Sequence, residues 1–181
     1  GYVGLTTSIG LASLGHQVIG YDLDPAKVEM LQAGKLPIHE PGLGEILTAG
    51  IKSGNLQITS LLSEAVAEAD FVFTCVPTPQ DEDGSADLSY VISASAAMKD
   101  FLKPGAVVVT KSTVPVGSAQ VVEDAIGRSD VEVASNPEFL REGAAVHDFN
   151  HPDRIVVGAR SNKVAQKVMD LYYKIDCTKI L

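Results

Sequence analysis

The first 22 residues constrain the fold most strongly. Glycines stand at positions 1 and 4, a stretch rich in apolar and small residues follows and ends at Gly15, and the segment 16–21 leads into Asp22. This order is typical of the second half of a dinucleotide-binding βαβ unit. In such a unit, backbone N–H groups at a helix N-terminus hold a pyrophosphate, and an acid after the next strand binds ribose hydroxyls. We therefore predict a helix over 2–14 and a strand over 16–21.

The spacing of the two glycines and the acid favours NAD as the cofactor. If Gly1 and Gly4 are the last two glycines of Gly-x-Gly-x-x-Gly, the first glycine and the first strand lie upstream of residue 1. Asp22 lies 18 positions after Gly4, and no Arg follows it to receive a 2′-phosphate. Taken without Asp22, the two glycines fit equally well a helix N-terminus in which glycine is needed only for close packing and no cofactor is bound. Lys27 either reaches the same ribose or is a solvated surface residue.

Composition excludes several classes of function. The chain has 181 residues, of which 45% are hydrophobic, which suits one domain over 1–181. A net charge of -9 argues against a nucleic-acid surface. Cys75 and Cys177 form neither a disulfide framework nor a zinc motif, which fits a cytoplasmic protein without a metal site. No signal peptide and no apolar run of transmembrane length is evident, so we expect no membrane partner.

Strands and helices alternate along the whole chain. Unbroken apolar runs such as 71–76 are typical of strands buried on both faces of a parallel sheet. The pattern predicts an α/β, Rossmann-like, doubly wound and mostly parallel sheet with helices on both faces. The predicted strands are 16–21, 56–59, 71–76, 106–110, 131–134 and 154–157. The predicted helices are 2–14, 25–33, 43–51, 62–68, 88–102, 118–126 and 162–173, and the predicted long loops are 77–87 and 135–152.

Three proline-containing loops are expected to lie at the same edge of the sheet. They follow the strands that end at Val76, Thr110 and Ala134, and prolines stiffen all three. In open α/β sheets the ligand binds outside the carboxyl ends of the strands. We therefore expect these loops to gather at the edge that holds the glycine turn and Asp22.

The chain resembles the UDP-glucose/GDP-mannose dehydrogenase family, the nucleotide-sugar 6-dehydrogenases. The resemblance is carried by Gly-Tyr-Val-Gly-Leu at 1–5, Lys-Ser-Thr-Val-Pro-Val-Gly at 111–117, Asn-Pro-Glu-Phe-Leu-Arg-Glu-Gly at 136–143 and His-Pro-Asp-Arg at 151–154. It covers essentially the whole chain. It implies oxidation of a nucleotide-sugar primary alcohol to a carboxylate in two steps with two NAD, in polysaccharide biosynthesis, by an enzyme that is a homodimer at full length.

The resemblance also implies roles for individual residues. The pyrophosphate contacts fall on Gly1, Tyr2, Val3 and Gly4, and the ribose contacts on Asp22 and Lys27. Contacts to the far side of the cofactor fall on Val76, Pro77 and Thr78, and those near the nicotinamide on Ser112 and Thr113. Substrate contacts fall on Glu138, Phe139, Leu140, Arg141 and Glu142, with Glu142 also next to the cofactor. Glu138 matches the family's acid/base residue, and Thr113 its residue that positions a catalytic water. Arg141 would bind a phosphate, pair with Glu142 or bridge subunits.

The chemistry of these residue types agrees with that implication. Hydride leaves a carbinol carbon only as the hydroxyl proton is drawn away, so a carboxylate or the water it orders is the expected base. The second oxidation needs a nucleophilic Cys, which the family carries in a Gly-rich motif of its following domain. That motif is absent here, and Cys75 and Cys177 are better explained as structural. We therefore expect an N-terminal cofactor domain, truncated at both ends and inactive alone.

Alternatives remain open at this point. Residues 5–7 (Leu-Thr-Thr) favour UDP-glucose over GDP-mannose or a UDP-N-acetylhexosamine as the substrate. Outside the enzyme class, the chain is either a non-catalytic nucleotide-binding module or a methyltransferase-like domain, which also combines a Gly-rich first loop with an acid after the second strand. A methyltransferase has no need of the loops 111–117 and 136–143.

Overall fold

The computed structural model describes residues 1–82, 84–177 and 179–181. Residue 83, in the predicted loop 77–87, and residue 178 lie outside this description. The chain divides into two compact units, which are described separately. The first comprises Gly1–Ala65, Phe139–Ile155 and Met169–Leu181, and the second Val66–Glu138 and Val156–Val168.

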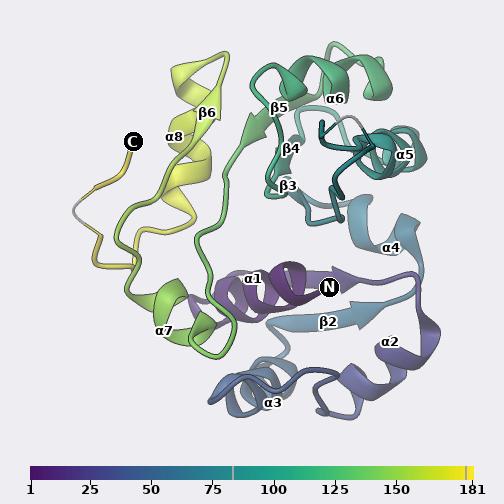
Figure 1. Ribbon diagram of the computed structural model, residues 1–181. Helices are drawn as coiled ribbons and strands as arrows, with labels where there is room; N and C mark the ends of the chain where they lie inside the picture. The colour runs from purple at the N-terminus through teal and green to yellow at the C-terminus, as the bar shows by residue number, and fades with distance from the viewer. Residues whose placement is uncertain (83, 178) are drawn as a thin grey trace. The chain divides into compact units, whose positions relative to one another are not determined.

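The first unit holds a two-stranded parallel sheet and the helices around it (Figure 1). Its elements are α1 (Tyr2–Ser13), β1 (Val18–Tyr21), α2 (Pro25–Gln32), α3 (Leu43–Ser53), β2 (Leu56–Thr59) and α7 (Ala145–Asn150). Helix α4 (Leu62–Val66) follows β2 in the chain. Strands β1 and β2 pair in parallel with Val18 opposite Leu56. Helix α2 begins where the sequence predicts, because the Asp24 carboxylate accepts the N–H groups of Ala26 and Lys27.

The core of this unit lies between α1, α2, α3 and the sheet. Nine buried apolar residues form it: Leu5, Ile9, Ala12, Val28, Leu31, Leu43, Leu47, Leu56 and Ile58. Helix α7 approaches α1 closely, since a Cβ atom at Gly10 would lie 2.5 Å from the Phe149 ring. The small residue at position 10 is therefore what allows α7 to pack on α1.

The second unit holds a four-stranded sheet in the order β3-β4-β5-β6. Its elements are β3 (Phe71–Thr74), α5 (Ser89–Met98), β4 (Val107–Thr110), α6 (Ser118–Ile126), β5 (Glu132–Ser135), β6 (Gly158–Ala159) and α8 (Asn162–Asp170). Strand β4 is buried along its whole length. The first three strands are parallel, and Thr74, Thr110 and Ser135 are in register. The loops that follow them therefore leave the sheet at the same level.

The predicted α/β class is confirmed, and several predicted bounds are wrong. The segment 71–76 is a strand only to Thr74, and the helix predicted over 88–102 is α5, which ends at Met98. The strand predicted at 154–157 is absent. The Asn136 side-chain amide donates to the Val156 carbonyl, and pairing with β5 begins only at Gly158. That pairing is antiparallel, and β6 is short and lies at the edge of the sheet.

Helix α7 lies within the predicted loop 135–152. Its N-cap residue, Ala144, offers no side-chain cap, so the segment carries no local start signal. Among the described residues, no helix has the length and apolar character that crossing a bilayer requires. Within the same residues, no group of three or more His, Cys, Asp and Glu side chains is placed to hold a metal ion.

Candidate functional site

The first turn of α1 presents backbone donors. The first helical hydrogen bond runs from the Leu5 N–H to the Gly1 carbonyl at 2.9 Å, so the N–H groups of residues 2–4 have no partner within the helix. Gly1 is the N-cap and has no side chain to satisfy them. A Cβ atom at Gly1 would meet nothing within 4 Å. This helix end is thus open to an anion, which the helix dipole also favours.

Asp22 lies beside this turn. One carboxylate oxygen is 3.5 Å from the Gly1 backbone nitrogen, and the other accepts the Asp24 N–H at 3.0 Å. The structure therefore brings together the glycine turn and the acid that the sequence pairs with it. Lys27 lies on the exposed side of α2, and its ammonium is 4.0 Å from the Asp24 carboxylate, so its ribose contact stays a prediction.

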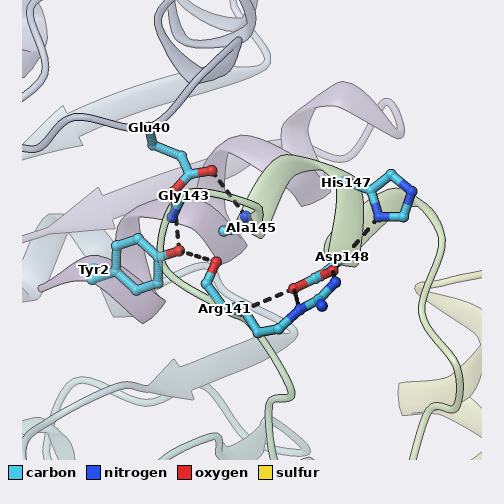
Figure 2. Close-up of polar contacts among 7 residues, drawn as sticks. All are labelled: Tyr2, Glu40, Arg141, Gly143, Ala145, His147 and Asp148. Carbon is cyan, nitrogen blue, oxygen red and sulfur yellow. Dashed lines mark hydrogen bonds and ion pairs between the residues drawn. The ribbon is translucent and has the colours of Figure 1, made fainter.

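A buried carboxylate that sequence reasoning missed connects α1 to the segment 141–145 (Figure 2). The Tyr2 hydroxyl lies 2.8 Å from the Arg141 carbonyl oxygen and 3.1 Å from Glu40 Oε2. Glu40 also accepts the backbone N–H groups of Gly143 and Ala145. Burial, followed by the hydrogen bond to Glu40, raises the pKa of Tyr2 far above its ordinary value, so the phenol stays protonated.

Arg141 has a partner that the sequence did not suggest. Its Nε and Nη2 donate to the two carboxylate oxygens of Asp148 at 3.0 and 2.6 Å, and its backbone N–H donates to the same acid. The Arg141 hydrogen bonds hold the pKa of Asp148 well below its usual range. Nearby, the Arg154 guanidinium lies 4.8 Å from the centre of the Phe139 ring. The exposed side chain of Glu142 lies in the same segment.

In the second unit, the loops after β3 and β4 are joined by two hydrogen bonds. Ser112 Oγ donates to the Val76 carbonyl at 2.6 Å, and Thr78 Oγ1 donates to the Thr113 carbonyl at 2.9 Å. Pro77 lies between the two bonded residues of its loop. Four of the predicted cofactor residues are thus held together at the carboxyl ends of neighbouring strands, as expected.

A buried lysine links the loop after β4 to the loop after β5. Lys111 is only 6% exposed, and its ammonium donates to Asn136 Oδ1 at 3.2 Å and to the Asn136 carbonyl at 3.4 Å. Burial lowers the pKa of Lys111 to about 8, while electrostatic interactions with Cys75 and Glu138 act in the opposite direction. Glu138 follows Asn136 by two residues, so the predicted acid/base residue belongs to this linked group of loops.

Residues 1–176 match the sequence model of the UDP-glucose/GDP-mannose dehydrogenase family, NAD binding domain. The chain belongs to this family. It is similar to UDP-glucose 6-dehydrogenase of Rhizobium meliloti (strain 1021), with 47% identity over 96% of this chain and 41% of the relative.

Solved structures of the family have the same fold. A UDP-glucose dehydrogenase from the hyperthermophilic archaeon Pyrobaculum islandicum superposes with a TM-score of 0.92 at 45% identity, over 99% of this chain and 44% of that one. A GDP-mannose dehydrogenase from Pseudomonas aeruginosa gives a TM-score of 0.89 at 33% identity, over 100% of this chain and 44% of that one. The chain therefore spans about two fifths of the length of the relatives it matches.

The family's cofactor is NAD, and the residues of the first unit fit it. Uncapped N–H groups at the start of α1 suit a pyrophosphate, and the Asp22 carboxylate beside them suits ribose hydroxyls. The two cysteines fit structural roles. Burial raises the pKa of Cys75 to about 11, so its thiol is protonated at neutral pH and is a poor nucleophile. Cys177 lies with its sulfur 3.5 Å from the Pro152 carbonyl oxygen.

Proposed function

We propose that residues 1–181 are the NAD-binding domain of a longer NAD-dependent nucleotide-sugar 6-dehydrogenase that oxidises UDP-glucose to UDP-glucuronate in two hydride transfers. The observation that supports this best is the linked group of loops at the carboxyl ends of β3, β4 and β5. It holds a hydroxyl residue, Thr113, and a carboxylate, Glu138, each three residues after one of the paired strand ends Thr110 and Ser135. An alcohol oxidation needs a base that takes the hydroxyl proton, directly or through a water, and Glu138 can act as that base while Thr113 orders the water.

In the proposed reaction, the chain's own residues handle the proton and the charge. The Thr113 hydroxyl holds a water, and Glu138 draws the proton of the sugar hydroxyl through that water. NAD, when bound, supplies the hydride acceptor. The Lys111 ammonium interacts electrostatically with Glu138. The segment that carries Phe139, Leu140 and Glu142 contributes substrate contacts.

Support for UDP-glucose comes from relatives of that name at 47% and 45% identity. The runner-up is GDP-mannose or a UDP-N-acetylhexosamine, since relatives named for GDP-mannose and for UDP-N-acetyl-mannosamine have the same fold. The triplet 5–7 does not decide between them by contact, because Leu5, Thr6 and Thr7 are all buried in α1. The family's NAD domain argues against a methyltransferase.

The test is NADH formation by the full-length protein with UDP-glucose, GDP-mannose and UDP-N-acetyl-mannosamine in parallel. We expect two NADH per UDP-glucose and much slower turnover of the other sugars. Preferred oxidation of GDP-mannose would establish the runner-up, and NAD binding without oxidation of any sugar would establish a non-catalytic module. Light scattering on the same sample tests the proposed homodimer.

The 181-residue chain gives a second test. We expect it to bind NAD weakly and not to complete the oxidation of UDP-glucose, because the second hydride transfer needs a nucleophilic Cys, which we propose lies in another domain. Two NADH per sugar from this chain alone would show that Cys75 or Cys177 performs the covalent step.

A further inference from the structure

The Glu40 carboxylate lies at the centre of a contact between the start of α1 and the segment 141–145. It is 5% exposed, and both of its oxygens accept backbone hydrogens. Oε2 accepts the Gly143 N–H at 2.8 Å, and Oε1 accepts the Ala145 N–H at 2.9 Å (Figure 2). A buried acid with two short, charge-assisted bonds to the same segment fixes the backbone of that segment.

Tyr2 connects this carboxylate to the cofactor turn. Its backbone belongs to the first residue of α1, whose N–H is among the donors proposed for the pyrophosphate. Its hydroxyl reaches both Glu40 Oε2 and the Arg141 carbonyl oxygen. A phenol has one proton to donate, so the two acceptors compete for it, and a small displacement of Tyr2 changes which of them receives it.

The segment held by these bonds exposes the side chains that are proposed to meet the sugar nucleotide. Its backbone is bonded at Arg141, Gly143 and Ala145, whereas the side chains of Arg141 and Glu142 are exposed. Gly143 adopts a φ of 82°, a conformation that glycine accepts readily and that brings its N–H to the carboxylate. Displacing this backbone would displace the exposed side chains with it.

We propose that Glu40 and Tyr2 form a clasp through which NAD bound at the first turn of α1 orders the segment 141–145 for the sugar nucleotide. Glu40 is then a positioning residue, and its effect on substrate rests on the proposed function. An anion bound at the first turn of α1 holds Tyr2 in place. The Tyr2 hydroxyl then holds the Arg141 carbonyl and the Glu40 carboxylate. The carboxylate in turn holds the backbone N–H groups of Gly143 and Ala145.

The first test uses NAD alone and hydrogen exchange of the amides in 141–145 of the full-length protein. In the wild type, NAD should slow exchange at Gly143 and Ala145. Glu40→Gln keeps the shape, but its amide has a single acceptor oxygen, so one of the two N–H groups faces a donor. We expect exchange roughly tenfold faster in this variant and no slowing by NAD, since a bond to a charged acceptor is lost. Glu45→Gln, on the exposed side of α3, is the matched control.

Two results would overturn the clasp: NAD leaving exchange in wild-type 141–145 unchanged, or NAD slowing it equally in Glu40→Gln.

If Glu40→Gln does not fold, Tyr2→Phe makes the same test, because it removes only the hydroxyl. That variant should lose the NAD-dependent slowing and should raise the KM for UDP-glucose roughly threefold to tenfold, with kcat changed less. An unchanged KM together with retained slowing would exclude a role for Tyr2. A wild type that shows the slowing but oxidises no sugar would refute the proposed function and leave the clasp intact.

Discussion

Among the described residues, each of the two units buries one charged side chain, and the hydrogen bonds of these two side chains differ. In the first unit, the Glu40 oxygens accept two backbone N–H groups at 2.8 and 2.9 Å. In the second unit, the Lys111 ammonium donates to two neutral oxygens of Asn136, at 3.2 and 3.4 Å. Short hydrogen bonds to a charged group offset part of the free energy lost when that group is removed from water, and longer bonds offset less. Glu40 is therefore suited to fixing a backbone, whereas Lys111 is a cation whose charge is easily lost.

The largest expected effect of a substitution is on catalysis, at Glu138 in the second unit. Glu138→Gln in the full-length enzyme should lower kcat by roughly 10²–10⁴, because an amide cannot take the hydroxyl proton. NAD affinity should be retained, since the proposed pyrophosphate and ribose contacts belong to the first unit. Glu132→Gln, exposed on β5, is the control and should be close to wild type in steady-state kinetics. Near-normal turnover by Glu138→Gln would leave this residue as a surface charge.

The next effect is on NAD affinity in the first unit. Asp22→Ala should weaken NAD by about 1–3 kcal/mol, the range for hydrogen bonds to a charged group. Titration calorimetry on the full-length protein measures this, with Glu29→Ala on the exposed side of α2 as the control. If Asp22→Ala binds NAD as tightly as the wild type, the acid beside Gly1 is not a ribose ligand.

Local signals account for the parts of the fold that the sequence predicted. Helix α2 was predictable because its cap, Asp24, and its first residue, Pro25, are adjacent in the chain. The parallel strands were predictable because apolar runs such as 107–110 alternate with helical spacing. The pairing of Asp22 with the turn at Gly1 was predictable because the spacing of a βαβ unit is nearly constant.

Long-range contacts account for what the sequence did not predict. The N–H of Ala145 is satisfied by Glu40, 105 residues earlier, so α7 begins without a neighbouring cap residue. From the sequence, Glu40 is one acid in a segment interrupted by Pro37, Pro41 and Gly42, and nothing there marks it as buried. The sequence places Lys111 in a loop motif, and only the packing shows that its ammonium is buried. Contacts of this kind have no period or spacing to detect.

The pH dependence of stability tests the second half of the contrast. The depressed pKa of Lys111, about 8 against an ordinary value of 10.5, means that burial penalises its charged form. Between these two pH values the unfolded state binds more protons than the folded state, so stability rises with pH. Relative to Lys111→Met, the wild type should therefore gain about 1–3 kcal/mol between pH 8 and pH 10.5, because a pKa difference of one between the folded and unfolded states is worth about 1.36 kcal/mol.

Urea denaturation of both proteins at a series of pH values measures this gain. Cys75 interacts electrostatically with Lys111 and titrates in the same pH range, so both proteins carry Cys75→Ala, which removes its titration from the difference. A difference that stays constant with pH would show that Lys111 is solvated more fully than its burial indicates.

The smallest effect concerns Asp148, which accepts a backbone N–H as Glu40 does but whose main partner, the Arg141 side chain, is exposed. The Arg141 side chain is 74% exposed, so solvent screens the ion pair and its loss should change stability little at neutral pH. Arg141→Gln should nevertheless raise the pKa of Asp148 towards its usual range, which carboxyl-carbon NMR titration measures directly. The change in pKa should be incomplete, because the backbone N–H of residue 141 still donates to the same carboxylate at 2.9 Å.

The sign of the corresponding stability change follows from linkage. In the wild type, the lowered pKa of Asp148 contributes stability that is complete above the ordinary value of about 3.9 and is lost as the pH falls below it. Arg141→Gln should therefore lose less stability than the wild type between neutral and acidic pH. If the pKa of Asp148 is unchanged in the variant, the Arg141 side chain does not set it, and Asp148 then fixes its segment as Glu40 does, by accepting a main-chain N–H, with His147 as a further neighbour.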